Sequence, residues 1–261
     1  MFNITLPDER QQIILQRLAE DGRVLAAELA RDFGTSEDTI RRDLRELAGT
    51  GQCRRVYGGA LPVSVASTTL QERVARAPAR KAALARAAVS LVRAGDVLLI
   101  DAGSTNEAIA RALPERQGIT VITYAPSIAT TLAGRDGVDV LLLGGRLDHR
   151  SGGTKGARVV DEIRRVRANL CFVGTCGISS GEGISASDRD EAEVKEAMVL
   201  SSESTAAVVT ADKLETRATF LAASVTSLTH LVVEANTLDS LLNLYRAAGV
   251  NVHSAEEAID D

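Results

Sequence analysis

The chain is poor in the residues that build disulfides, metal sites and nucleophilic catalytic centres. Three cysteines among 261 residues are an odd number, and their spacing matches no zinc or redox motif, so we expect reduced and mostly buried thiols. The three histidines are scattered and form no motif with a serine or cysteine. The sequence therefore predicts no metal, no cofactor and no nucleophilic triad.

Long apolar runs are also missing. No stretch approaches the roughly 20 apolar residues that span a bilayer, and the N-terminus lacks the basic-then-apolar pattern of a signal peptide. Acidic residues outnumber basic ones by 35 to 30, which disfavours nonspecific coating of nucleic acid. With 45% hydrophobic residues, the chain can fill one small core and one larger α/β core. We expect a cytoplasmic protein of two domains with no membrane partner.

Residues 36–47 separate apolar and basic side chains onto two faces of one short helix. The apolar positions recur at i, i+4 and i+7, as a buried stripe does: Ile40, Leu44 and Leu47. Three arginines lie outside that stripe: Arg41, Arg42 and Arg45. Ser36 is placed to cap the helix, and an amphipathic helix over 24–33 precedes it across a break at Gly34. This pattern is typical of a helix-turn-helix module.

An extended run over 52–57, which ends at Gly58-Gly59, predicts a β wing with Arg54 and Arg55 beside a DNA groove. From 41 to 58, five arginines stand against two acidic residues, and this local charge attracts phosphates. Together with Ser36 and Thr39, the five arginines form the predicted DNA-binding set. A solvated helix face with the same arginines is the alternative. We expect double-stranded DNA as a partner and at least a dimer on it, because so few cations give modest affinity per subunit.

The composition changes after Ala60, and we predict a DNA-binding domain over 1–60, a linker over 61–79 and an α/β domain over 80–261. In the last of these, aliphatic runs alternate with helices. The expected strands are 97–101, 119–123, 138–143, 170–173, 206–210 and 230–233. Near-continuous aliphatic runs indicate a doubly wound, mostly parallel sheet covered on both faces.

Ligands of such sheets bind outside the carboxyl ends of the strands. Asp101-Ala-Gly-Ser-Thr105 ends one strand and opens a helix, so Gly103, Ser104 and Thr105 offer amides and hydroxyls to an oxyanion such as phosphate. An ordinary helix cap is an equal alternative. Lys213 follows another strand, where ligand contact and solvation are equally expected. Glu191 and Lys195 are spaced i, i+4, for which an exposed surface pair is the alternative.

These residues resemble the DeoR family of bacterial transcription regulators. The N-terminal resemblance is carried by Ser36, Thr39-Ile-Arg-Arg-Asp-Leu44, Leu47, Gly51, Arg54 and Gly58-Gly59-Ala60. The C-terminal part is similar to the family's sensor domain, whose fold resembles ribose-5-phosphate isomerase. The matching positions there are Asp101-Ala-Gly-Ser-Thr105, Thr123, Leu143-Gly144-Gly145, Gly156, Gly174, Gly177-Ile178, Glu191, Lys195 and Lys213.

The resemblance implies a regulator, most often a repressor, that binds DNA as a homo-oligomer (a dimer or tetramer) and responds to a phosphorylated sugar. It implies that the effector site includes Asp101, Thr123, the Gly144–Gly145 pair, Gly174, Glu191, Lys195 and Lys213. The chain departs from the family pattern at Thr35, Tyr124 and Asn169, and we expect the last two to alter the effector pocket. The alternative is an isomerase-like enzyme with a DNA-binding arm, for which Asp101 and Glu191 are the available carboxylates.

Overall fold

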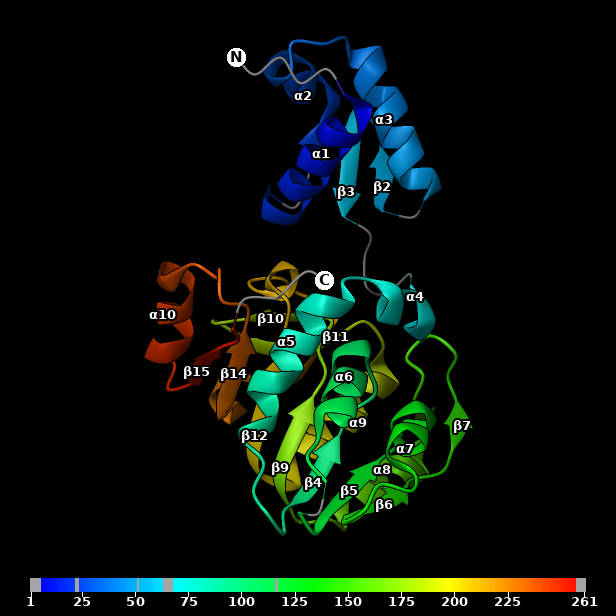
Figure 1. The fold of residues 1–261 in the computed structure, drawn as a ribbon, viewed down its shortest axis with the longest axis vertical. Coiled ribbons are helices and arrows are strands. Elements are labelled where there is room, and N and C mark those ends of the chain that lie inside the picture. Colours follow the sequence, from blue (N-terminus) through cyan, green and yellow to red (C-terminus); the bar gives the residue numbers. More distant parts are fainter. Residues whose placement is uncertain (1–5, 22–23, 51, 63–67, 116, 257–261) are drawn as a thin grey trace. The chain divides into compact units, whose positions relative to one another are not determined.

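The computed structural model describes residues 6–21, 24–50, 52–62, 68–115 and 117–256. The chain divides into two compact units, Met1–Ser67 and Thr68–Asp261, which are described separately (Figure 1). None of the described helices is long and apolar enough to cross a membrane.

The first unit is a small three-helix domain with a three-stranded antiparallel sheet in the order β1-β3-β2. Its elements are α1 (Pro7–Asp21), β1 (Val24–Leu25), α2 (Ala26–Asp32), α3 (Glu37–Gly49), β2 (Cys53–Val56) and β3 (Gly59–Pro62). Helix α3 begins because the Ser36 hydroxyl accepts a hydrogen bond from the Thr39 amide at 3.1 Å. The predicted apolar stripe of α3 is buried in the core of this unit. The predicted winged helix-turn-helix is confirmed.

The wing is held close to the rest of this unit by backbone geometry. A Cβ on Gly59 would lie 1.9 Å from the carbonyl oxygen of Val24, so β3 can approach β1 only without a side chain there. Gly58 has φ +83°, which an L side chain rarely adopts, and it makes the turn between β2 and β3. The strand β3 continues to Pro62, two residues beyond the predicted end of the domain at residue 60.

The second unit is built on a seven-stranded parallel sheet in the order β15-β14-β12-β9-β4-β5-β6. Its strands are β4 (Val97–Ile100), β5 (Ile119–Thr123), β6 (Val138–Leu142), β9 (Ala168–Val173), β12 (Ser202–Val208), β14 (His230–Val233) and β15 (Asn251–Ser254). All six predicted strands are present, and β15 was not predicted. The predicted doubly wound α/β fold is confirmed.

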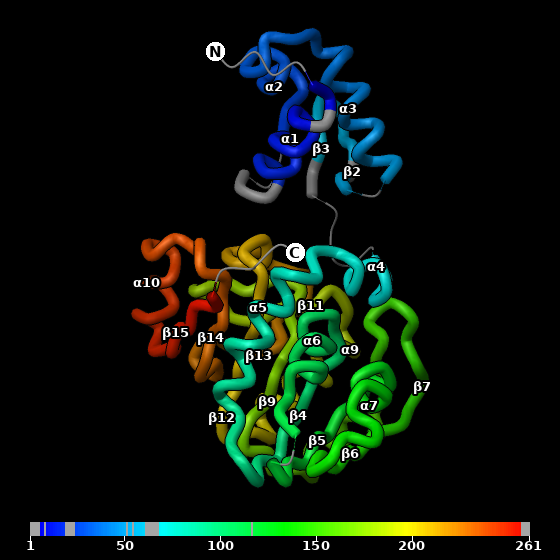
Figure 2. Tube along the Cα trace, in the orientation of Figure 1, coloured from blue at the N-terminus to red at the C-terminus, as the bar shows by residue number. Residues whose placement is uncertain are grey.

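Helices cover both faces of this sheet (Figures 1 and 2). One layer consists of α5 (Pro78–Val89), α6 (Ser104–Ala112) and α7 (Pro126–Leu132), and the other contains α8 (Ala157–Arg164) and α9 (Arg189–Leu200). The helix α10 (Asp239–Ala247) precedes β15. Two smaller antiparallel elements were not predicted. They are a sheet of β10 (Gly177–Ser179), β11 (Gly183–Ala186) and β13 (Phe220–Ser224), and a pair formed by β7 (Arg146–Leu147) and β8 (Thr154–Lys155).

The segment 68–79, which we expected to be part of a linker, is folded into the second unit. It contains α4 (Leu70–Ala75), which starts with a reciprocal capping box: the Thr69 amide donates to Glu72, and the Glu72 amide donates to the Thr69 hydroxyl. Arg80, where we expected the second domain to start, already lies inside α5 and donates to Glu234. Of the predicted linker, residues 63–67 lie outside the described residues.

The strand β6 lies at an edge of the large sheet, and two of its leucines are more exposed than those of the central strands. Leu141 is 51% exposed and Leu142 is 45% exposed. An edge strand has a neighbouring strand on one side only, so an aliphatic run that reads as a central strand is left partly uncovered here.

Candidate functional site

Four of the predicted DNA-binding arginines lie on the solvent-exposed surface of the first unit: Arg41, Arg42, Arg45 and Arg55. Arg41 is partly neutralised within its own helix, because its guanidinium lies 2.9 Å from Glu37 and 3.6 Å from Asp38. Among the described residues, Arg42, Arg45 and Arg55 are exposed and make no ion pair or hydrogen bond through their side chains. Arg54 belongs to β2, and its side chain lies outside the described part of the structure. Unpaired exposed guanidinium groups on a recognition helix and a wing suit contacts to DNA.

In the second unit, Asp101 forms the centre of a buried cluster directly after β4. Lys195 Nζ lies 2.6 Å from Asp101 Oδ2 and 3.1 Å from Glu191 Oε1. The Gly174 amide also donates to Asp101 Oδ2 at 2.6 Å, and the Tyr124 hydroxyl donates to Oδ1. Burial by itself would lower the pKa of Lys195, but the charges of Asp101 and Glu191 more than offset burial and raise this pKa well above its usual value. The cluster ties β4, β5, β9 and α9 together.

This geometry bears on two expectations, the exposed Glu191–Lys195 pair and the contact of Asp101 with an effector. The Glu191–Lys195 pair is present, but the Lys195 side chain is 1% exposed, so the alternative of a surface pair is wrong. Asp101 was a candidate for effector contact, yet both of its oxygens are occupied by protein donors. Gly174 has no room for a side chain, since a Cβ there would lie 2.9 Å from Asp101 Oδ2.

The loop after Asp101 presents unused polar groups. Gly103 precedes α6 with φ 150° and ψ 155°, a conformation that L side chains rarely adopt, and it provides no side-chain cap. In the described part of the chain, neither the Ser104 nor the Thr105 hydroxyl is hydrogen-bonded to another protein group. The next residue, Asn106, fixes the loop by donating to the carbonyls of Asp101 and Phe172 at 2.9 and 3.2 Å. A helix N-terminus with free hydroxyls can receive an anion.

Three cations of the second unit lie within electrostatic range of one another: Arg73, Lys81 and Lys213. Within the described residues none of them pairs with a carboxylate, and they donate to backbone carbonyls. Lys213 Nζ lies 2.8 Å from the Thr175 oxygen, Lys81 donates to the carbonyls of Arg73 and Arg76, and Arg73 donates to those of Thr68 and Arg150. Burial lowers the pKa of all three, and burial together with the charges of Lys213 and Arg76 lowers that of Lys81 to about 8.

This cation cluster, Arg73, Lys81 and Lys213, adjoins the loop at the start of α6. Helix α4 packs on α6, and Arg73 is within electrostatic range of Glu107 in the first turn of α6 and of Glu191 on α9. Sequence reasoning found Lys213 but missed Arg73 and Lys81. The signal for Arg73 was the pattern Thr69-x-x-Glu72, which begins a helix in the segment that we assigned to the linker.

The remaining predicted site residues play local structural roles. Thr123 donates to the Ile100 carbonyl at 2.7 Å and accepts from the Ala125 amide at 3.1 Å. Gly145 allows close packing, because a Cβ there would lie 2.9 Å from Val159 and 3.0 Å from the Lys155 oxygen. A Cβ on Gly144 would meet nothing within 4 Å. These contacts neither require nor exclude a ligand.

The two departures from the family pattern lie in different places. Tyr124 is buried in the Asp101 cluster, and its ring packs on Gly153, where a Cβ would lie 2.4 Å from Tyr124 Cε2. Asn169 instead accepts from the Val97 amide at 2.9 Å, at the amino ends of β9 and β4. Because Asp101 follows the carboxyl end of β4, Asn169 lies at the opposite end of these strands from the Asp101 cluster.

The cysteines and histidines take no part in these clusters as metal ligands. Cys53 and Cys171 are buried, Cys176 is half-buried, and no group of three metal-ligating side chains is found among the described residues. The histidines are less scattered than the sequence indicated, because His230 Nδ1 and His253 Nε2 lie 3.1 Å apart on neighbouring strands.

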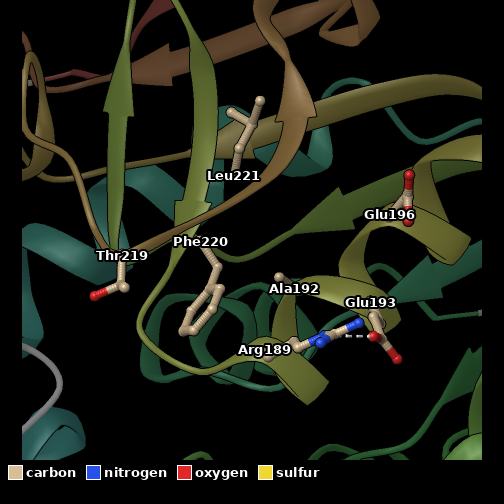
Figure 3. Close-up of a pocket in the computed structure, with 7 residues that line it drawn as sticks. All are labelled: Arg189, Ala192, Glu193, Glu196, Thr219, Phe220 and Leu221. Atoms are coloured by element: carbon tan, nitrogen blue, oxygen red, sulfur yellow. Dashed lines mark hydrogen bonds and ion pairs between the residues drawn. The ribbon is translucent and has the colours of Figure 1, made fainter.

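An open pocket of about 430 Å³ lies on another face of α9 (Figure 3). It is lined by Arg189, Ala192, Glu193, Glu196, Thr219, Phe220 and Leu221. Its one arginine is already paired with Glu193 at 3.1 Å, as the dashed line in Figure 3 shows. With two carboxylates against one cation, this pocket repels phosphate and does not compete with the cation cluster as an anion site.

The fold and these surfaces define a class of protein, a DNA-binding regulator with a separate ligand-sensing domain. Residues 10–65 match the DeoR-like helix-turn-helix domain, and residues 76–235 match the DeoR C-terminal sensor domain. The chain belongs to the DeoR family.

The relatives of this chain include repressors and regulators. It is 33% identical over 192 residues to the glycerol-3-phosphate regulon repressor of Escherichia coli (strain K12), covering 73% of this chain and 76% of that protein. It is 33% identical over 238 residues to the HTH-type transcriptional regulator GlpR of Haloferax volcanii, covering 90% and 92%. Ribose 5-phosphate isomerase A from Neisseria gonorrhoeae is a structural neighbour with a TM-score of 0.37 and 17% identity, covering 51% of this chain and 52% of that one.

Proposed function

We propose that this protein is a transcriptional repressor of carbohydrate transport or catabolism genes, and that a phosphorylated sugar or related metabolite relieves its binding to a DNA operator. The observation that carries the effector part is the cation cluster. Lys81 is buried and Arg73 and Lys213 are half-buried, and among the described residues none of the three forms an ion pair with a carboxylate, although Asp212, Glu107 and Glu191 lie within electrostatic range of one or more of them. Burying like charges together is unfavourable, and a bound dianion offsets that cost.

The surroundings favour a phosphate that carries a polyol rather than a bare anion. The amides and free hydroxyls at the start of α6 add donors for phosphate oxygens. Glu107 and Glu191 lie within range of Arg73 and supply carboxylate oxygens that can accept from sugar hydroxyls. Names of the relatives support the same ligand class, since one is a glycerol-3-phosphate regulon repressor.

The DNA-binding part rests on α3 and the wing. We propose that Arg41, Arg42 and Arg45 enter the major groove and that Arg54 and Arg55 contact phosphates beside it. Few cations per subunit give modest affinity, so we expect a homo-oligomer on a symmetric operator. The exposed aliphatic edge at Leu141 and Leu142 supports self-association. Because its target is chromosomal DNA, we expect the protein in the cytoplasm.

We infer that the protein is a sensor and not an isomerase. An isomerase needs a carboxylate base beside the substrate carbons. Asp101 is fully buried and bonded to Lys195, Tyr124 and Gly174, so this carboxylate is not available as a base. Turnover of ribose 5-phosphate by the purified protein at ordinary enzymatic rates would overturn this inference.

The effector assignment is tested first with a thermal-shift panel of sugar phosphates. A ligand at a hundred times its dissociation constant stabilises the protein by roughly 2.7 kcal/mol. Lys213→Ala and Arg73→Ala are then compared with Arg164→Ala, an exposed arginine on α8. We expect Lys213→Ala and Arg73→Ala to lower the affinity for the sugar phosphate by roughly 10- to 150-fold, because a hydrogen bond to a charged group contributes about 1.5–3 kcal/mol. Unchanged affinity in both would remove the cation cluster as the effector site.

A further inference from the structure

Lys81 holds the end of α4 in the structure. Its ammonium is buried and donates to the carbonyl of Arg73 and, at 2.5 Å, to that of Arg76. These are carbonyls of the last turn of α4 and of its C-cap residue. We propose that effector binding unlocks α4, because the effector's anion draws the Lys81 ammonium away from these carbonyls. This inference rests on the proposed function, in which Lys81 belongs to the effector site.

Helix α4 depends on such contacts for its stability. It has six residues, and a helix this short does not form by itself in water. Its N-terminus is fixed by the capping box, and Leu70 packs against Gly152 so tightly that a Cβ on Gly152 would lie 2.2 Å from Leu70 Cδ2. The C-terminal end has no glycine cap, and the Lys81 ammonium bonds the carbonyls of Arg73 and Arg76 there, beside the hydrogen bonds that Arg73 makes to Thr68 and Arg150.

The connection from α4 to α5 is strained in the locked arrangement. Ala77 has φ 47° and ψ 57°, in the left-handed region that is unfavourable for a residue with a Cβ. It lies four residues before Lys81, and the Lys81 amide donates to the Ala77 oxygen at 3.3 Å. Strain of this kind persists only where neighbouring contacts impose it. Loss of the ammonium bonds to α4 therefore lets Ala77 return to a relaxed conformation.

The anion is the stronger partner for this ammonium. Backbone carbonyls are neutral acceptors, whereas a phosphate adds the attraction between two full charges to its hydrogen bond with the ammonium. The neighbouring charges of Lys213 and Arg76 also favour an anion at this point. Helix α4 is the first element after the segment that joins the sensor to the DNA-binding unit. Release of α4 lengthens the connection to the helix-turn-helix. The two DNA-binding units of a dimer are then held less firmly at the distance that separates two half-sites.

Hydrogen exchange on the full-length protein tests the inference directly. The probe is inorganic phosphate, with its binding to the same protein measured by calorimetry. We expect phosphate to speed amide exchange several-fold over residues 73–77, while the β4 amides remain unchanged. Phosphate binding with unchanged or slower exchange at 73–77 would overturn the unlocking of α4 and leave the proposed function standing. Failure of phosphate to bind would overturn the cation cluster as an anion site, and with it the unlocking of α4, but not the DNA-binding part of the proposed function.

A second test uses the strained residue and leaves the cation cluster intact. Valine tolerates the left-handed region less well than alanine, so Ala77→Val disfavours the locked arrangement. Because the locked state competes with anion binding, this variant should bind phosphate about 3- to 10-fold more tightly than the parent. The matched control is Ala82→Val, at an exposed position inside α5, which should stay within about twofold of the parent since its helical backbone is unstrained. Equal or weaker binding by Ala77→Val would refute the coupling.

Discussion

Replacing Lys195 with methionine should destabilise the sensor domain far more than the loss of an ordinary surface lysine. The change removes the ammonium 2.6 Å from Asp101 Oδ2 in a pair whose side chains are 1% and 0% exposed. Breaking a buried ion pair costs about 3–5 kcal/mol, because the remaining charge is left without its counter-ion. Asp101 keeps the Gly174 amide and the Tyr124 hydroxyl as donors, so we expect the lower end, about 3 kcal/mol.

Calorimetry of the full chain, with the sensor transition followed by circular dichroism, measures this loss. For a unit of this size, about 3 kcal/mol corresponds to a fall in Tm of roughly 6–12 °C. The matched control is Lys155→Met, which also removes a lysine that contacts two carboxylates, at 3.4 Å from Asp148 and 3.1 Å from Asp188. The two carboxylates that Lys155 contacts are partly exposed, so the loss of these ion pairs should lower the free energy of unfolding by no more than about 1 kcal/mol.

The double variant Asp101→Asn, Lys195→Met, compared with each of the two single variants, completes a double-mutant cycle. After an amide flip, the Asn oxygen accepts from the Gly174 amide and its NH₂ donates to the Tyr124 hydroxyl. No charge is then left unpaired on Asp101, and the stability should recover by about 1–3 kcal/mol relative to Lys195→Met. If Lys195→Met and Lys155→Met lower the free energy of unfolding equally, a structural ion pair at Asp101 is refuted. It is also refuted if the loss in the double variant equals the sum of the losses in the single variants. A double variant that still binds effector would separate this pair from ligand recognition.

Three further predictions concern DNA, pH and assembly. Arg45→Ala should weaken operator binding by about 1–3 kcal/mol if its contact is bidentate, whereas Arg55→Ala should weaken binding to every sequence and reduce its salt dependence, as anisotropy titrations over a range of salt will show. Because burial lowers the pKa of Lys81 to about 8 and a bound dianion raises it, effector affinity should fall as the pH rises from 7 to 9. Calorimetry on Lys81→Arg should show a smaller fall, since burial lowers the pKa of Lys213 as well. Leu141→Lys should shift sedimentation toward smaller species while Leu238→Lys, a change at another exposed leucine, should not; an unchanged profile for Leu141→Lys would exclude β6 as the interface.

The elements that sequence predicted well are those whose pattern is local. The α3 stripe of Ile40, Leu44 and Leu47 predicts its own burial, and the Ser36 cap fixes where the helix begins. The six aliphatic strands are equally evident, because a parallel strand covered on both faces needs apolar residues at nearly every position. Strand order and edges are not local properties, so the exposure of Leu141 on β6 could not be read from the same pattern.

The effector site was predicted only in part for a related reason. Lys213 and the Ser104–Thr105 turn follow strands, where ligands of such sheets bind, and this rule finds them. Arg73 and Lys81 join them from helices that precede the first strand of the sheet, and nothing in the spacing shows that these residues come together. Asp101 and Lys195 are 94 positions apart in the chain, so only the folded sheet shows that they neutralise each other.

The contact between Tyr124 and Gly153 constrains how this lineage can diverge. The ring occupies the space that a methyl group at position 153 would need, since the two atoms would be only 2.4 Å apart. Position 153 is therefore confined to glycine while the tyrosine is present: a smaller residue must replace the tyrosine before a side chain can appear at 153, where it would also lie close to Ala102. Among related sequences, an aromatic residue at the position of Tyr124 should thus be accompanied by glycine at the position of Gly153.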